Sequence, residues 1–381
     1  MTPGKPETLP SASRSRLEYI DWMRGLACLL MFQAHCYDSW LSPAVRNSRF
    51  FIGSQLLATM PAPIFLFLAG VALALMTDKS ERKGVPPAQV ANTILRRGAG
   101  IFGLGILFRM QDFIVFPWAP WTDLLRVDIL NTIGLAIVLV GTLLWIFRRF
   151  SSGKASALIG WSSLVALTIA CATPPLYTTW RMRWLPWPLE TYINGVHTFD
   201  QPQAWLFPIF PWSAFAFAGF AVGFVLASDW ARRHAAQATA LAGVAGLAFM
   251  YFSNLFDHNS LHLYSTYDYW HTSPNFFLIR VGILLLILFL SYAWCAWGPG
   301  LLGFSPLVQL GQTSLLVYWV HIEFVYGRFS ILPKGVNNIA RASLGLLIIF
   351  CSMLALSLLR TKMKGRTIEW WNSIRRPLKA F

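Results

Sequence analysis

Charged residues are scarce in this sequence. They make up 12% of its 381 residues, whereas hydrophobic residues make up 56%. A soluble domain carries about a quarter of its residues as Asp, Glu, Lys and Arg. Apolar runs of about 20 residues recur along the chain, and each is long enough to cross a bilayer core of about 30 Å. The composition therefore excludes an ordinary soluble domain and predicts an all-α, polytopic membrane protein.

Several signatures of soluble enzymes are also missing. No Gly-rich phosphate loop follows a strand pattern, and no serine occupies a nucleophile elbow. The five cysteines are odd in number and follow no spacing pattern, so we expect neither disulfides nor a cysteine metal site. His258 and His262 have the four-residue spacing of zinc ligands on a helix, but their segment reads as a loop without a HEXXH glutamate. We therefore expect no metal.

The apolar segments predict about ten transmembrane helices in one domain over residues 18–360. A polar stretch rich in Pro and Ser at 1–17 is expected to be a disordered cytoplasmic tail, since it lacks the short basic start of a signal peptide. Residues 361–381 are expected to form a basic cytoplasmic tail. The helices are expected near residues 20–41, 55–77, 93–111, 124–147, 157–176, 205–228, 236–254, 274–297, 307–331 and 341–360.

Basic residues outnumber acidic residues by 31 to 16, for a net charge of +15. With the N-terminus in the cytoplasm, the inside segments hold 20 of the Lys and Arg residues and the outside segments hold nine. Cytoplasmic loops carry an excess of Lys and Arg, so both termini are predicted to be cytoplasmic. We expect the bacterial inner membrane. This topology and an anionic lipid surface account for the basic charge, so no nucleic-acid partner is predicted.

A stripe of polar residues runs along the first apolar segment. It repeats at alternating spacings of three and four residues and comprises Asp21, Arg24, Cys28, Met31, His35 and Asp38. A helical turn holds 3.6 residues, so Arg24 and His35 share a face and lie about 16 Å apart along the axis. Alone, Arg24 would fit a cytoplasmic anchor and His35 a packing histidine. Together they favour a functional site, since ionisable groups within membranes mark substrate paths.

The stretch RLEYIDWMRGLACLLMFQAH (16–35) resembles the first-helix signature of the transmembrane acyltransferases. In that signature an Asp precedes an Arg by three residues, and ten residues then separate the Arg from a His. This Arg-x10-His spacing is typical of the bacterial acyltransferase-three type. The IDxxRG opening and PIFLFLAGVALAL (63–75) are more similar to the heparan-α-glucosaminide N-acetyltransferase catalytic-domain family. GQTSLLVYWVHIEFVYG (311–327) is similar to the late G-x-x-S-L-x-x-Y-x-x-H motif of that family.

The resemblance implies transfer of an acyl group from cytoplasmic acyl-CoA, most simply acetyl-CoA, to a hydroxyl or amine of a glycan or other envelope acceptor. Arg24 is expected to bind CoA near the cytoplasm. Arg96 and Arg97, at the start of the third segment, fit either CoA binding or ordinary anchoring. His35 is the expected general base, and a covalent acyl-histidine route stays open. The other expected site residues are Asp21, Asp38, Asp128, Asn131 and His321.

Two functions of other classes also fit. A transporter or exporter would use the Asp, Arg and His stripe as an ion or substrate path, but no internal repeat and no matched pair of broken helices is evident. A non-catalytic scaffold would leave the stripe unexplained. Trp-rich outer segments such as 180–192 fit either an interfacial aromatic belt or a platform for stacking a sugar. Arg280, inside the eighth apolar segment, is expected to find a carboxylate or carbonyl partner.

Overall fold

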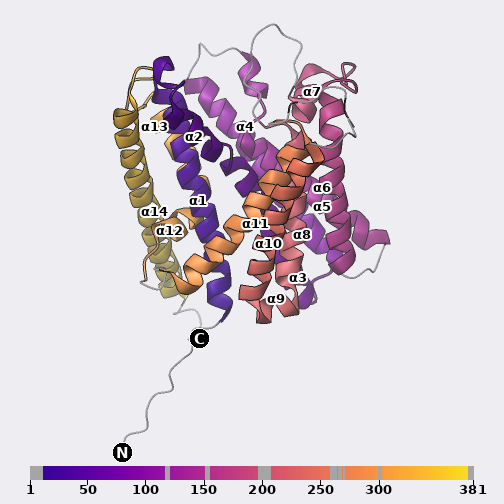
Figure 1. Cartoon of the computed structure of the whole chain (residues 1–381). Coiled ribbons are helices and arrows are strands. Elements are labelled where there is room, and N and C mark those ends of the chain that lie inside the picture. Colours follow the sequence, from indigo (N-terminus) through magenta and orange to yellow (C-terminus); the bar gives the residue numbers. More distant parts are fainter. Residues whose placement is uncertain are drawn as a thin grey trace, which may run out of the picture. The chain divides into compact units, whose positions relative to one another are not determined.

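A computed structural model describes residues 12–115, 121–150, 155–195, 207–257, 264, 268, 271–298 and 303–375. These residues form helices without a strand, which confirms the predicted all-α class. Two short 3-10 turns, η1 (Pro43–Val45) and η2 (Trp121–Leu125), accompany the α-helices. In chain order the helices are α1 (Ala12–Trp40), α2 (Arg49–Ala58), α3 (Pro61–Arg82), α4 (Pro87–Val115), α5 (Ile129–Phe150), α6 (Ala155–Tyr177), α7 (Trp187–Asn194), α8 (Ile209–Ala227), α9 (Asp229–Arg233), α10 (Ala235–Asp257), α11 (Pro274–Trp297), α12 (Pro306–Gln312), α13 (Ser314–Val325) and α14 (Ile339–Arg375) (Figure 1).

Eight of the described segments are long and apolar enough to cross a membrane. They comprise Arg49–Arg82, Pro87–Val115, Trp121–Phe150, Ala155–Tyr177, Ile209–Ala227, Ala235–Ser253, Pro274–Trp297 and Ile339–Lys364. The predicted first span coincides with α1, a continuous helix of 29 residues that carries the polar stripe and is not among these eight segments. The chain is therefore an integral membrane protein.

The predicted ninth span, 307–331, is wrong as one continuous helix. The chain forms α12 and α13 instead, because Thr313 between them has φ −120° and ψ 20°. The Thr313 hydroxyl lies 2.6 Å from the hydroxyl of Ser357 on α14, and Ser357 also donates to the Gln309 carbonyl at 2.9 Å. The second bond gives a polar partner to a carbonyl of the interrupted backbone, which an apolar environment requires.

The chain folds as two compact units. The terminal unit comprises Met1–Ala58 and Leu288–Phe381, and the central unit comprises Thr59–Ile287. α1 begins at Ala12, within the predicted 1–17 tail, and residues 1–11 lie outside the described part. α14 continues to Arg375, so the helix extends into the segment that was predicted as the basic tail.

Close helix contacts build the central unit. A Cβ atom added to Gly70 of α3 would lie 1.9 Å from the Ala216 carbonyl oxygen of α8. One added to Gly219 of α8 would lie 1.9 Å from the Phe67 carbonyl oxygen of α3. Helices in a bilayer associate through such small residues, because their backbones can then pack closely. The conspicuous 63–75 stretch therefore serves helix packing.

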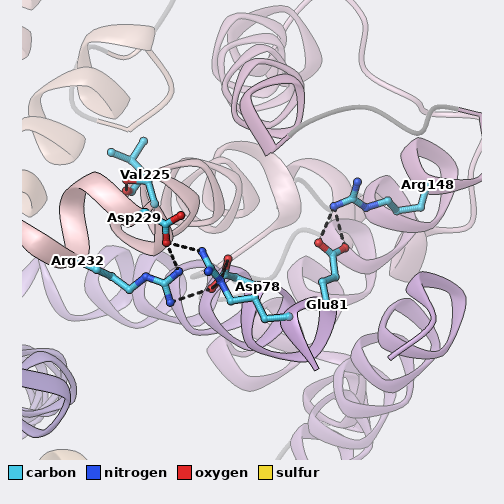
Figure 2. A network of polar contacts seen from close by, with 8 residues as sticks. Asp78, Glu81, Arg148, Val225, Asp229 and Arg232 are labelled. Atoms are coloured by element: carbon cyan, nitrogen blue, oxygen red, sulfur yellow. Dashed lines mark hydrogen bonds and ion pairs between the residues drawn. The ribbon is translucent and has the colours of Figure 1, made fainter. Parts of the chain in front are cut away.

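Ion pairs gather several helix ends at one end of the central unit (Figure 2). Arg148 near the end of α5 contacts Glu81 of α3 at 2.8 Å, and Arg232 of α9 contacts Asp229 at 2.8 Å and Asp78 of α3 at 3.8 Å. These residues belong to connections that the charge count assigned to the cytoplasmic side. The end of α3, the end of α5 and the helix α9, all predicted to lie on the cytoplasmic side, therefore meet at one end of the central unit.

The starts of α5 and α8 meet the end of α6 at the other end of this unit. The Thr132 hydroxyl donates a hydrogen bond to the Phe207 carbonyl, and the Tyr177 hydroxyl donates to the Phe210 carbonyl at 3.0 Å. α5 and α8 thus run from this end to the ion-paired end, and α3 ends beside them. The spans of the central unit alternate in direction, as their loop charges predicted.

In the terminal unit, α1 packs directly on α12. A Cβ atom added to Gly25 would lie 1.8 Å from the Leu307 carbonyl oxygen, and one added to Gly311 would lie 1.9 Å from the Asp21 carbonyl oxygen. Gly25 belongs to the IDxxRG stretch and Gly311 opens the late motif. The glycines of both motifs therefore serve the same helix contact.

Replacing Gly25 by Ala is expected to destabilise the protein by about 1–3 kcal/mol, because the added methyl group overlaps a backbone carbonyl. Gly53 of α2 is the matched control, since a Cβ there meets nothing within 4 Å. Gly53→Ala is expected to leave stability unchanged or to raise it, through better helix propensity. Thermal unfolding of the purified variants in detergent measures both effects. Equal melting temperatures for the two variants would contradict the packing described.

Candidate functional site

α1 and α13 bring two histidines together in the terminal unit. His35 Nδ1 lies 2.8 Å from His321 Nε2, and the two ring planes are nearly parallel, with an interplanar angle of 6° and centroids 5.1 Å apart. His321 is fully buried, whereas His35 is partly exposed. The sequence predicted both residues for one cavity, and the structure adds a direct bond between them.

The hydrogen bonds of this pair fix which ring nitrogens carry a proton. His321 Nδ1 lies 2.8 Å from the Val317 carbonyl oxygen, and because a carbonyl only accepts, Nδ1 carries the proton. In neutral His321 the lone pair is then on Nε2, which accepts the Nδ1–H of His35. Nε2 of neutral His35 carries the remaining lone pair. This nitrogen has the chemistry of a general base.

Tyr326, at the end of α13, connects Asp38 to the histidine pair. Its hydroxyl donates to Asp38 Oδ2 at 2.7 Å, and its ring lies edge-on to the His35 ring with centroids 5.3 Å apart. Arg46 approaches the same carboxylate at 3.8 Å. The Asp38 side chain is 60% exposed, so its carboxylate faces outward beside the pair.

Neither Tyr326 nor Arg46 was predicted from the sequence as a site residue. Tyr326 lies in the quoted stretch 311–327, but five residues after His321 correspond to about 140° around a helix, so this spacing did not mark a shared face. Arg46 was counted only as a loop cation, and nothing in its local sequence marks a contact with Asp38.

The ends of α1 and α13 are held together by bonds to backbone carbonyls. The Ser39 hydroxyl donates to the Val325 carbonyl at 2.8 Å, and Asn337 Nδ2 donates to the Trp40 carbonyl at 3.0 Å. Ser39 and Asn337 are both buried. Buried hydrogen bonds of this kind rigidify the backbone that carries the site.

Asp21 and Arg24 form the predicted ion pair near the start of α1, with 2.9 Å between Arg24 Nη1 and Asp21 Oδ1. Gln312 of α12 also bonds to the Asp21 carboxylate. About a quarter of each charged side chain is exposed. Because α1 is continuous, Arg24 and His35 keep the predicted separation of about 16 Å along one helix.

Arg96 and Arg97 lie in the central unit, where both side chains are exposed. The expectation that they open their helix is wrong. α4 begins at Pro87, so they lie more than two turns inside it. Their proposed contact with CoA stays a prediction.

Asp128 and Asn131 hold α5 to α4 in the central unit. Arg109 Nη2 lies 2.6 Å from Asp128 Oδ2, and Asn131 Nδ2 donates to the Phe102 carbonyl at 3.3 Å. Arg109, counted from sequence among the outside loops, is a buried residue of α4. Burial raises the pKa of Tyr192 on α7 to about 12, and the Asp128 carboxylate adds to this rise. A role for Asp128 and Asn131 in acyl transfer stays a prediction.

No group of three or more His, Cys, Asp or Glu side chains suited to a metal occurs in the described part of the chain. His258 and His262, weighed above as zinc ligands, lie outside that part.

The proton positions of the pair can be measured by ¹⁵N NMR of histidine-labelled protein at neutral pH. His35 is expected to be protonated at Nδ1 and unprotonated at Nε2, since His321 Nε2 accepts its proton. His35→Gln and His321→Gln variants assign the two sets of signals. A His35 ring with its proton on Nε2 would contradict the bond pattern.

Comparison with known protein families gives a match over most of the chain. The family described as heparan-alpha-glucosaminide N-acetyltransferase, catalytic, matches residues 16–264. This match includes His35 and the first-helix stripe, and it ends before His321. No curated protein matches the chain.

Proposed function

Because the chain belongs to the heparan-alpha-glucosaminide N-acetyltransferase catalytic family, a family of membrane acetyltransferases, we propose that it acetylates an envelope acceptor. The donor is cytoplasmic acetyl-CoA. The acceptor is a hydroxyl or amine of a glycan or another envelope molecule, and His35 is the general base. The host membrane is the bacterial inner membrane, with both chain ends in the cytoplasm.

The observation that carries this proposal is the hydrogen bond between His35 Nδ1 and His321 Nε2, which leaves the lone pair of neutral His35 on Nε2. A general base needs a nitrogen that accepts a proton at the operating pH, and histidine supplies one near neutrality. The bond from His35 Nδ1 to His321 Nε2 at 2.8 Å fixes that tautomer before substrate binds. Such preorganisation avoids a rearrangement during the reaction.

The transfer proceeds as one displacement at the thioester carbonyl. The acceptor oxygen or nitrogen attacks the carbonyl carbon while its proton passes to His35 Nε2. The C–S bond then breaks, and CoA leaves as a thiolate that takes a proton from the His35 imidazolium. His35 returns to its starting state, and the acetyl group forms an ester or amide with the acceptor.

Two charged groups on α1 bind different substrates: Arg24 binds CoA and Asp38 binds the acceptor. Arg24 lies toward the predicted cytoplasmic end, where its guanidinium suits the phosphates or amides of CoA. Asp38 lies beyond His35 toward the other end, and its exposed carboxylate suits acceptor hydroxyls. The acyl-bearing pantetheine arm would span the distance of about 16 Å between Arg24 and His35.

One feature favours the alternative class, a transporter. The break at Thr313 between α12 and α13 resembles the discontinuous helices at which transporters bind substrate. Family membership favours the enzyme. Flux of a substrate through liposomes without any response to acetyl-CoA would favour the transporter.

Replacing His35 by Gln is expected to lower kcat at least 100-fold, because loss of a general base typically costs a factor of 10²–10⁴. The measurement is transfer of labelled acetyl from acetyl-CoA to an envelope extract. His234→Gln is the matched control, since His234 is exposed in the central unit. Full activity of the His35→Gln protein, folded and pure, would remove His35 from the mechanism.

Acetyl-CoA is expected to raise the melting temperature of the purified protein, because a ligand that binds only the folded state stabilises it. Arg24→Gln should weaken this response, whereas His35→Gln should retain it. A flat response to acetyl-CoA in the unmodified protein would contradict the proposed donor. Mass spectrometry of envelope glycans and lipids, with and without the protein, then identifies the acceptor.

A further inference from the structure

Arg280 is a buried cation within α11 of the central unit. Only 6% of the residue is exposed. Its Nε atom is buried without a hydrogen-bond partner. The sequence predicted a carboxylate or carbonyl partner for it, and that expectation is wrong across the described residues. The guanidinium carbon lies instead 3.6 Å from the centre of the Phe276 ring, one turn earlier on the same helix.

The stacking on Phe276 uses none of the hydrogen-bonding capacity of the guanidinium. A guanidinium donates its N–H groups in its own plane, and an aromatic ring covers one face of that plane. Phe276 is itself fixed, with 3% exposure and edge contacts to Trp212 and Phe215 of α8. The Phe276 ring therefore holds the Arg280 guanidinium in one orientation.

Three carboxylates of the same unit pair with other arginines. At the end of the central unit where α5 and α8 begin, Asp128 and Asp112 both contact Arg109, at 2.6 and 3.3 Å. Glu190, also buried, pairs with Arg181 at 2.6 Å. Each of these carboxylates contacts an arginine, whereas Arg280 Nε is buried without a hydrogen-bond partner.

A buried charge without a counter-ion is costly in an apolar interior. An oriented guanidinium matches the two oxygens of a carboxylate or phosphate, to which arginine binds in bidentate fashion. We propose that Arg280 binds an oxyanion of a ligand that enters the central unit, either a carboxylate or a phosphate. The ligand is an acidic sugar or an anionic lipid, and the shared group is the oxyanion.

Arg280 lies near the end of the central unit at which α8 begins, opposite the end that holds the ion pairs of Asp78 and Glu81. α11 starts at Pro274, and Phe276 contacts Trp212 near the start of α8. Arg280 thus lies about 9 Å along α11 from its first residue. By the loop charges, this is the non-cytoplasmic end. The site rests on the central unit alone and does not depend on the chemistry proposed at His35.

The test is thermal unfolding of the purified protein in a neutral detergent at constant ionic strength. Glucuronate and glucose 1-phosphate are compared with glucose, and phosphatidic acid is compared with diacylglycerol. At least one anion is expected to raise the melting temperature by several degrees over its neutral counterpart. A response to the sugar acids identifies a soluble ligand, and a response to phosphatidic acid identifies a lipid.

Three variants make the test specific. Arg280→Met keeps the volume and removes the charge, so the anion response is expected to vanish. Arg280→Lys keeps the positive charge but removes the planar guanidinium that can bind two oxygens, so a smaller rise in melting temperature is expected. Arg183→Met, which removes an exposed arginine of the same unit, is expected to respond as the unmodified protein does.

Two results would overturn the proposal. In one, no anion stabilises the unmodified protein more than its neutral counterpart does. In the other, Arg280→Met or Arg280→Lys responds as strongly as the unmodified protein. Arg280 would then be a structural residue whose charge the fold tolerates.

Discussion

The hydrogen bond between His35 and His321 is the constraint on which the terminal unit depends. It joins the first helix to α13, near the other end of the chain, through two rings whose planes are nearly parallel. Each ring would lose a hydrogen-bond partner without the other, and an unsatisfied polar group is costly in an apolar interior. The same bond assigns the protons of both rings. One contact therefore both joins α1 to α13 and sets the proton positions of the two histidines.

The two units use polar residues in different ways. In the central unit, arginines and carboxylates pair at both ends of the bundle and hold helix ends together, as Glu81 with Arg148 and Asp128 with Arg109. In the terminal unit, the buried His321 bonds to the partly exposed His35, and the Asp38 carboxylate stays exposed beside them. Within the central unit Arg280 differs from the paired arginines, since it is buried and stacks on the apolar Phe276 ring.

The sequence predicted the features that follow from helical period and average polarity. The spacing of three and four residues placed Arg24 and His35 on one face, and loop charges predicted the alternation of spans in the central unit. It did not predict the break at Thr313, because hydropathy is an average that stays high across one interrupted turn. Long-range partners were also missed, such as Arg109 for Asp128 and Tyr326 for Asp38. Such pairs depend on how distant segments pack, which no local pattern records.

The central claim is that His321 fixes the tautomer that makes His35 a base. The most direct test is kcat for acetyl transfer in His321→Gln and His321→Leu, two variants of similar size. The introduced glutamine supplies an amide oxygen that can accept the Nδ1–H of His35, whereas the introduced leucine supplies no acceptor. The glutamine variant is predicted to retain most of the rate, and the leucine variant is predicted to lose at least tenfold while acetyl-CoA still stabilises both proteins. Equal rates in the two variants would contradict the claim.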